Sequence, residues 1–304
     1  MPSPNRIALL GATGQLGHDI ARVAGEKGLE LIPFGHEEVE VADLESVKKA
    51  LAKIRPEVVV NCAAFHQVDR CEEDPAQAFQ ANAVGAFNVA RSANELGAKC
   101  VYVSTDYVFS GDKPPSKEGA TSSANSYVEA DRPAPVNVYG ISKLAGEQLT
   151  VTAQPKALIV RVASLFGVAG ARGKGGNFVE TILKKARDGG PLQVVSDQFM
   201  TPTYAMDAAD AILRLVELNA GGVVHASNSG ACSWFDFAVK AVELTRLKAR
   251  VQPVSALIYP SKARRPANSA LNNSHLAELL GRDQRSWEDG LQAYLSEKGY
   301  LRAA

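Results

Sequence analysis

Residues 135–149, PVNVYGISKLAGEQL, place a tyrosine and a lysine four residues apart in a segment patterned as a helix. That spacing puts Tyr139 and Lys143 on one helix face. A phenol has an ordinary pKa of about 10, but a nearby ammonium and an oxidised nicotinamide both favour the phenolate and lower that pKa. We therefore expect Tyr139 to donate a proton to a carbonyl oxygen as hydride reaches the carbon. The alternative is an ordinary helix, in which Lys143 is a surface charge that pairs with Glu147.

A threonine at the end of a strand-like run completes the candidate catalytic group. Thr105 follows the apolar run Lys99–Ser104, and the carboxyl ends of parallel strands face the ligand crevice of an open α/β sheet. If the helix of Tyr139 lies at the same edge, the Thr105 hydroxyl can hydrogen-bond and polarise the reacting carbonyl oxygen. Lys143 can also reach the ribose hydroxyls beside the nicotinamide, so that one side chain orients the cofactor and tunes the acid.

The stretch GATGQLG at residues 11–17 predicts a dinucleotide-binding turn. It follows a strand-like run and opens a helical pattern, where glycines permit close backbone approach and helix N–H groups receive a pyrophosphate. The alternative is a tight turn that binds nothing. The residues that we expect to hold NADP(H) or NAD(H) are Gly11, Gly14, Gln15, Leu16, Asp43, Leu44, Ala63, Ala64, Ser104, Tyr139 and Lys143.

The sequence leaves the preference between the two cofactors open. The second strand-like run ends Pro33-Phe34-Gly35-His36. It offers neither the carboxylate that favours NAD nor the arginine that favours a 2′-phosphate. His36 either approaches such a phosphate or lies in solvent.

Strand-like and helical segments alternate through the first half of the chain. This alternation predicts right-handed βαβ crossovers and an α/β fold with a Rossmann-type, doubly wound parallel sheet. The expected strands are Arg6–Leu10, Leu29–Phe34, Glu57–Asn61, Lys99–Ser104 and Ala157–Val162, and the expected helices are 14–27, 43–54, 75–97 and 139–152.

The second half has a different pattern, which predicts a smaller C-terminal substrate-binding lobe. We expect a dinucleotide-binding domain over residues 1–166 and a lobe over most of 167–304, with later strands near 192–226 returning to the first domain. The expected later helices are 177–188, 234–247, 274–280 and 286–297. Residues 111–135 form a long polar loop, a length typical of functional lids or disordered excursions.

Composition excludes several classes of protein. The 304 residues contain 33 Lys and Arg and 33 Asp and Glu, so no net charge favours nucleic acid or an anionic membrane. No apolar stretch reaches the roughly 20 residues that span a bilayer. The four cysteines form no CxxC pair and predict a reducing, cytoplasmic compartment. The five histidines show no metal-ligand spacing, so we assign no metal site.

Six stretches together resemble the dTDP-4-dehydrorhamnose reductase family of the extended short-chain dehydrogenase/reductases. They cover nearly the whole chain in order: GATGQLG (11–17), STDYVF (104–109), NVYGISKLAGE (137–147), GGNF (175–178), DQFMTPTYAMDAAD (197–210) and RRPANSAL (264–271). The resemblance implies hydride transfer from NAD(P)H to C4 of a nucleotide-linked 4-keto-6-deoxy sugar, giving dTDP-L-rhamnose. It also implies that Thr105, Tyr139 and Lys143 are catalytic and that Asp106 and Tyr107 lie near the sugar.

The sequence departs from the family pattern in two places. Ser164 stands where the family often has a tryptophan beside the substrate, and the loop before Tyr139 is longer than usual. A different deoxy sugar is therefore an alternative substrate, and a non-catalytic regulatory subunit of the same fold is an alternative function. Some family members dimerise around Mg²⁺, so the resemblance allows a homodimer and a metal for which the sequence supplies no ligands.

Several other residues allow two interpretations each. Arg172 and Lys174 either clamp a nucleotide diphosphate or lie in a solvated loop, and Asn177 either binds the sugar or belongs to that loop. Arg264 and Arg265 contact a phosphate or pack as surface charges. We expect Trp234 and Trp287 to be core anchors rather than stacking platforms.

Overall fold

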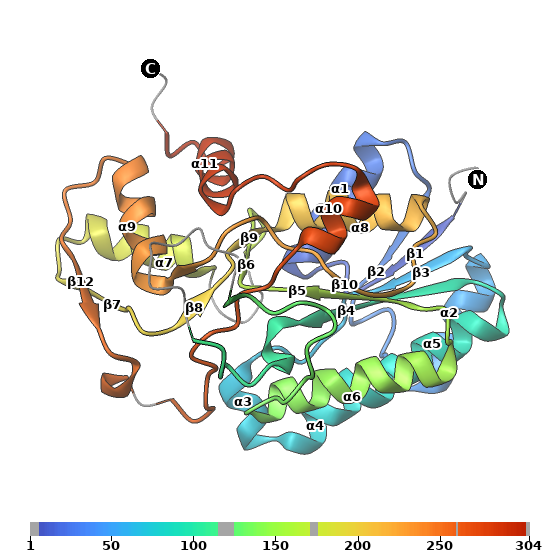
Figure 1. Ribbon diagram of the computed structural model, residues 1–304. Coiled ribbons are helices and arrows are strands. Elements are labelled where there is room, and N and C mark those ends of the chain that lie inside the picture. The colour runs from blue at the N-terminus through green and yellow to red at the C-terminus, as the bar shows by residue number, and fades with distance from the viewer. Residues whose placement is uncertain (1–5, 115–124, 171–175, 260, 302–304) are drawn as a thin grey trace.

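Six apolar runs form one parallel sheet in a computed structural model, which describes residues 6–114, 125–170, 176–259 and 261–301 (Figure 1). The order across the sheet is β2–β1–β3–β4–β5–β10. Most of these strands are buried on both faces, as parallel strands between helices require, whereas β2 is a partly exposed edge strand that tolerates Pro33. The strands are β1 (Ile7–Leu10), β2 (Leu31–Phe34), β3 (Val58–Asn61), β4 (Lys99–Thr105), β5 (Leu158–Val162) and β10 (Gly222–His225).

Helices cover both faces of this sheet (Figure 1). On one face α1 (Gln15–Glu26), α8 (Ala205–Glu217) and α10 (Ser274–Leu280) pack against the apolar side chains of the strands. On the other lie α2 (Leu44–Ile54), α5 (Gly85–Glu95) and α6 (Val138–Ala153). The predicted doubly wound α/β fold is therefore confirmed.

The strand order fixes where a ligand can bind. The chain runs from β1 outward to β2 and then returns to β3 on the other side of β1, so the order reverses between β1 and β3. At such a switch point the loops beyond the carboxyl ends of the strands diverge and leave a crevice. The predicted helix over 75–97 lies beside this crevice and is built as α4 (Pro75–Phe79), the π-helical turn η1 (Gln80–Val84) and α5, after the short helix α3 (Val68–Glu73).

The later segments form a smaller lobe with its own core. Here α7 (Phe178–Arg187), α9 (Trp234–Leu244) and α11 (Trp287–Glu297) surround buried aromatic side chains. Three two-stranded sheets complete it: β7 (Leu192–Val195) with β12 (Val251–Val254), β8 (Phe199–Met200) with β11 (Cys232–Ser233), and β6 (Leu165–Phe166) with β9 (Thr203–Tyr204). The 3-10 turn η2 (Asp106–Val108) directly follows β4 of the main sheet, and the 3-10 turn η5 (Ala256–Ile258) follows β12.

Two expectations for the second half need correction. Of the two late strands, β10 joins the main sheet beside β5, but β7 pairs with β12 in the lobe and does not return. The sequence also missed α8, which carries eight buried residues and packs along α1. Residues beyond 166 therefore complete the face of the main sheet as well as forming the lobe.

Candidate active site

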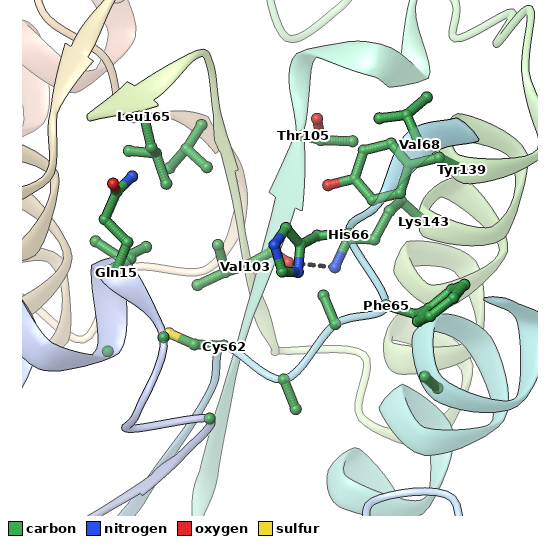
Figure 2. Close-up of a pocket in the computed structure, with 18 of the residues that line it drawn as sticks. Gln15, Cys62, Phe65, His66, Val68, Val103, Thr105, Tyr139, Lys143 and Leu165 are labelled. Carbon is green, nitrogen blue, oxygen red and sulfur yellow. Dashed lines mark hydrogen bonds between the residues drawn. The ribbon is translucent and has the colours of Figure 1, made fainter. Parts of the chain in front are cut away.

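One cavity of about 1000 Å³ runs from the glycine turn, past the end of β4, to the aromatic side chains of the lobe. Its wall contains Thr105, Tyr139 and Lys143 together with Gly11, Gly14, Gln15 and Leu16, so the two sequence-predicted groups face the same space. The close-up in Figure 2 shows Gln15 on one side of this space and the Tyr139 phenol on the other.

The glycine turn is shaped so that larger residues do not fit. Gly11 has a φ of +76°, and a Cβ there would lie 2.7 Å from the backbone nitrogen of Ala63. A Cβ on Gly17 would overlap the carbonyl oxygen of Gly11. This close approach leaves the N-terminus of α1 open to the cavity, where unpaired N–H groups and the helix dipole favour an anion.

The wall next to this turn differs in part from the prediction. Ala63 and Ala64 line the cavity as expected, but Asp43 and Leu44 do not. The Asp43 carboxylate instead caps α2 by accepting a hydrogen bond from the backbone N–H of Glu45 at 2.9 Å. The residues just before them, Val41 and Ala42, take that place in the wall.

The end of β2 carries His36, which lines the cavity with a largely exposed side chain. Three glutamates follow it in this loop. Glu37 is exposed and lies outside the cavity wall, and the carboxylates of the other two already accept backbone hydrogen bonds. Glu38 accepts from Gly35 at 2.7 Å, and Glu40 accepts from Ala42 at 2.9 Å. The carboxylates of Glu38 and Glu40 are thus each partly occupied by hydrogen bonds within their own loop. In NAD-specific sites, by contrast, a carboxylate is directed at the ribose hydroxyls of the cofactor.

Tyr139 lies in the first turn of α6, which begins at a local signal in the sequence. The side chain of Asn137 caps the helix by accepting from the N–H of Gly140 at 2.8 Å. Burial raises the pKa of Tyr139 above its ordinary value, and a hydrogen bond with Thr105 opposes this rise. The expectation of a lowered pKa is therefore wrong for the protein alone, and Tyr139 is a neutral phenol that holds its proton.

Lys143 is buried, with 2% of its surface exposed. Its Nζ donates a hydrogen bond of 2.6 Å to the carbonyl oxygen of Val103 (Figure 2). The same Nζ lies 4.0 Å from the centre of the Tyr102 ring. Burial lowers the pKa of Lys143 to about 7. The surface-helix alternative is wrong, because Glu147 is also buried and pairs with Arg161 on β5.

The π-helical turn η1 supports the floor of this site from behind. Its Asn82 is fully buried and donates hydrogen bonds of 3.0 Å to the carbonyl oxygen of Phe65 and to the hydroxyl of Ser142. Its side-chain oxygen accepts from the N–H of Phe65 at 2.8 Å. Asn82 thereby fixes the cavity-lining segment after β3 to the helix that carries Tyr139. The sequence placed His66 near the cofactor, and it does line the cavity, whereas Phe65 and the nearby Cys62 were missed by the sequence prediction.

Asp106 and Tyr107 also line the cavity. Asp106 is 3% exposed, and burial raises the pKa of its carboxyl to about 6 although hydrogen bonds with Ser269 and Thr105 oppose this. The Tyr107 ring meets that of Tyr139 edge to face, with centroids 5.9 Å apart. Arg265 approaches Tyr107 and forms an ion pair with Asp69 at 3.0 Å. It therefore lies at the edge of the site, where its guanidinium is paired with a carboxylate.

The lobe contributes the far end of the cavity. Asn177 lines it, but the Asn177 side chain caps α7 and donates to the Gly167 carbonyl oxygen at 3.0 Å, which commits most of its hydrogen-bonding capacity. Ser164 lines the wall in a left-handed conformation with a φ of +41°. Trp234 packs against the core of the lobe, as expected, with its ring 4.6 Å from that of Phe178, and it also lines the cavity. Trp287 is a buried core residue as expected.

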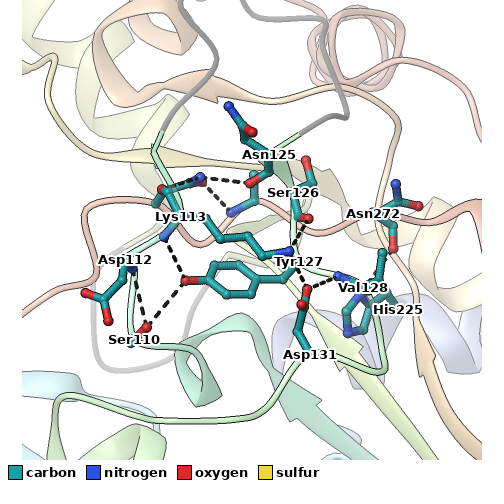
Figure 3. A network of polar contacts seen from close by, with 12 residues as sticks. Ser110, Asp112, Lys113, Asn125, Ser126, Tyr127, Val128, Asp131, His225 and Asn272 are labelled. Carbon is teal, nitrogen blue, oxygen red and sulfur yellow. Dashed lines mark hydrogen bonds and ion pairs between the residues drawn. The ribbon is translucent and has the colours of Figure 1, made fainter.

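The described residues at the two ends of the long loop are held beside β4 by side-chain contacts (Figure 3). The Tyr127 ring stacks on Phe109 with centroids 4.1 Å apart, and its hydroxyl accepts from the N–H of Gly111 at 3.1 Å. Lys113 forms an ion pair with Asp131 at 2.5 Å. Within residues 111–114 and 125–135, no side chain reaches the cavity wall. Arg172 and Lys174 lie outside the described residues.

Among the described residues, no three His, Cys, Asp or Glu side chains lie together as a metal would require. Over the same residues, no helix combines the length and apolarity needed to cross a bilayer.

A parallel sheet with a glycine turn at its switch point, and a Tyr-x-x-x-Lys helix beside it, define a short-chain dehydrogenase/reductase. The sequence model described as "RmlD substrate binding domain" matches residues 5–299. The chain belongs to the dTDP-4-dehydrorhamnose reductase family, whose members are NAD(P)-dependent oxidoreductases.

Individual relatives agree with this assignment. The dTDP-4-dehydrorhamnose reductase of Escherichia coli is 33% identical, with 96% of this chain and 97% of that protein covered. The spore coat polysaccharide biosynthesis protein SpsK of Bacillus subtilis is 36% identical, with 96% and 98% covered. A dTDP-4-dehydrorhamnose reductase from Bacillus anthracis, solved in complex with NADP, superposes with a TM-score of 0.88 at 36% identity, covering 96% and 99% of the two chains.

Proposed function

We propose that this protein uses NADPH to reduce the C4 keto group of dTDP-4-dehydro-L-rhamnose to dTDP-L-rhamnose. The observation that carries the proposal is the position of Thr105, Tyr139 and Lys143 on one wall of a cavity that begins at the glycine turn. Relatives with the corresponding name align along nearly the whole chain, which supports the same reaction.

The residues present fit a nicotinamide dinucleotide. The turn at Gly11 and Gly17 leaves room for a backbone-held diphosphate, and the buried Oε1 of Gln15 has no hydrogen-bond partner among the described residues. Gly11, Gly14, Gln15 and Leu16 would hold the dinucleotide, with Ala63 and Ala64 opposite. When bound, NADPH supplies the hydride that a keto group accepts.

The side chains of the protein supply the proton and the orientation. Tyr139, kept neutral by burial, donates its phenolic proton to the C4 oxygen as that oxygen gains charge. The Thr105 hydroxyl donates to Oδ1 of Asp106 at 3.0 Å in the protein alone, and it would turn to donate a hydrogen bond to the C4 oxygen and fix its position. Lys143, anchored on the Val103 carbonyl, directs its remaining N–H groups toward the nicotinamide ribose and favours the phenolate that forms.

The lobe would bind the nucleotide part of the substrate. Phe178 and Trp234 offer aromatic surface at the far end of the cavity, and Asp106 offers a buried carboxyl oxygen that has no partner among the described residues. A thymine ring gains from aromatic contact, and a sugar hydroxyl gains from a buried acceptor. We assign the substrate contacts to this lobe and to Asp106 and Tyr107 on that basis.

A second candidate is a ketoreductase for a different deoxy sugar. Ser164 favours it, because a small polar residue in the wall leaves more space than the tryptophan expected there. The discriminating experiment measures NADPH oxidation with a panel of nucleotide-linked 4-keto-6-deoxy sugars and identifies each product by NMR. A kcat/KM highest for dTDP-4-dehydro-L-rhamnose supports the first proposal, and a higher value for another sugar replaces it with the second.

Two properties of the whole protein are part of the proposal. The four cysteines, all within the described residues, are free thiols, which fits a reducing compartment such as the cytoplasm. A homodimer is proposed from the family resemblance alone, and sedimentation of the purified protein tests it.

A further inference from the structure

A buried ion pair lies directly behind the candidate active site. Arg161 of β5 donates two hydrogen bonds to the Glu147 carboxylate of α6, from Nε at 2.9 Å and from an Nη atom at 2.7 Å. The Ser104 hydroxyl donates a third at 2.5 Å. Both charged side chains are at most 6% exposed. A carboxylate held by three donors in the interior has one fixed orientation.

This pair and the candidate catalytic lysine share one interface between α6 and β4. Lys143 and Glu147 are four residues apart, so they lie on the same face of the helix. Lys143 donates to the carbonyl oxygen of Val103, and Glu147 accepts from the next residue of the strand, Ser104. The carboxylate therefore occupies the position along α6 immediately below the ammonium.

Stability alone does not explain a buried ion pair at this position, because burying two charges costs free energy that burying apolar residues of similar size does not cost. Three charged groups are packed here: two cations, Lys143 and Arg161, and the single carboxylate of Glu147 between them. Titratable groups near Lys143 include Tyr139 on the same helix, Tyr102 on β4 and Cys62 after β3, and burial favours the neutral form of each of these three. His66 lines the same cavity.

We propose that Glu147 is a positioning residue for the reaction: its carboxylate, fixed by Arg161 and Ser104, keeps Lys143 cationic and aligned in the cavity wall. The proposal rests on the proposed role of Lys143 as a cofactor-binding cation. Burial already lowers the pKa of Lys143 to about 7, and the charge of Glu147 acts against that fall. Without the carboxylate, Lys143 would be mostly neutral at pH 7 and would lose much of its hold on the ribose.

The test measures NADPH binding from pH 5.5 to 9 by fluorescence, so it needs no turnover of the sugar. In the wild type, affinity falls as pH rises through the pKa of Lys143. In Glu147→Gln, we expect the midpoint of this pH dependence to move down by about one pH unit and the Kd for NADPH at pH 7 to rise several-fold. Because titration of the ligand itself is common to all variants, the displacement between them reports the protein.

A control is available in another bidentate pair among the described residues, between Asp207 and Arg285. Asp207→Asn breaks the same kind of contact away from Lys143, and we expect it to leave the midpoint unchanged. If Glu147→Gln does not fold, the double variant Glu147→Leu/Arg161→Leu removes both charges and restores apolar packing. We expect the double variant to keep the lowered midpoint.

The outcomes separate the two proposals. A folded Glu147→Gln or double variant with the wild-type midpoint would overturn the role of Glu147, as would a wild-type affinity with no dependence on protein titration in this range. A failure of the proposed function would instead appear as normal NADPH binding, with the expected midpoint shift, and no oxidation with any keto sugar of the panel.

Discussion

Gly11 and Gly17 are packed so closely across the first turn of α1 that a Cβ on Gly17 would overlap the carbonyl oxygen of Gly11 and lie 2.8 Å from Cα of Ala12. The overlap involves backbone, which cannot move without reshaping the turn. Gly25 lies in the same helix and would meet nothing within 4 Å.

We therefore expect opposite effects from two alanine substitutions in α1. Gly17→Ala should lower the free energy of unfolding by about 1–3 kcal/mol and abolish the thermal stabilisation given by NADPH. Gly25→Ala should raise that free energy by about 0.5–1 kcal/mol, because alanine restricts the unfolded chain. Urea unfolding and thermal shifts with NADPH check both. Normal NADPH binding in Gly17→Ala would contradict the role of the turn.

Thr105→Val keeps the shape of the side chain and removes the hydroxyl that we propose hydrogen-bonds the keto oxygen. We expect kcat to fall by about 10²-fold while the Kd for NADPH stays unchanged, because the lost hydrogen bond forms mainly in the transition state. Thr105→Ser retains the hydroxyl and serves as the control, with kcat near that of the wild type. Equal losses in both variants would point to packing rather than to the hydroxyl.

Asp106 gives a prediction about stability and pH. Its folded-state pKa is about 6, above the unfolded value of 3.8, so between these values the folded protein binds more protons than the unfolded chain. Stability contributed by this group is thus present at low pH and lost as pH rises through about 6. Asp106→Asn should stabilise the protein at pH 7.5, by at most about 3 kcal/mol, and much less at pH 4.5.

Melting temperatures of wild type and Asp106→Asn at both pH values measure this difference. A variant that is equally or less stable than the wild type at pH 7.5 would show that the carboxylate is better satisfied than its burial suggests. The same variant should turn over the sugar more slowly, because its amide replaces an acceptor that faces the cavity.

His36 gives a prediction about cofactor preference. It lines the cavity at the end of β2, where Glu38 and Glu40 are held by backbone N–H groups. We expect the wild type to prefer NADPH, and His36→Ala to raise the KM for NADPH by up to about tenfold with little change for NADH. Glu37→Ala, an exposed neighbour outside the wall, is the control. Equal changes for the two cofactors would exclude contact with the 2′-phosphate.

The parts of the fold that were predictable depend on local sequence. Buried strands appear as short apolar runs, and the cap at Asn137 and the glycine turn at residues 11–17 are local signals. Strand β7 could not be assigned to its sheet, because its pairing with β12 involves residues almost 60 positions away. Helix α8 was missed although its sequence is clearly amphipathic, with buried residues that recur at helical spacing along the side that packs on α1.

The candidate site could be predicted where a local motif defines it. It could not be predicted where burial in the folded protein sets the pKa of a group or its hydrogen-bond partner. Thr105, Tyr139 and Lys143 do meet in one cavity. The shift in the pKa of Tyr139 was predicted with the wrong sign, since helix spacing shows a nearby ammonium but not the burial that outweighs it. The alternative interpretation paired Glu147 with Lys143 because sequence reveals only neighbours along the helix, whereas the partner of Glu147 is Arg161 on β5.

The most direct test of the central claim is Tyr139→Phe, which removes one oxygen atom and the transferable proton. NADPH oxidation with dTDP-4-dehydro-L-rhamnose should lose about 10²–10⁴-fold in kcat, while the Kd for NADPH and the melting temperature remain close to those of the wild type. Turnover of Tyr139→Phe at the wild-type rate would contradict the assignment of Tyr139 as the proton donor.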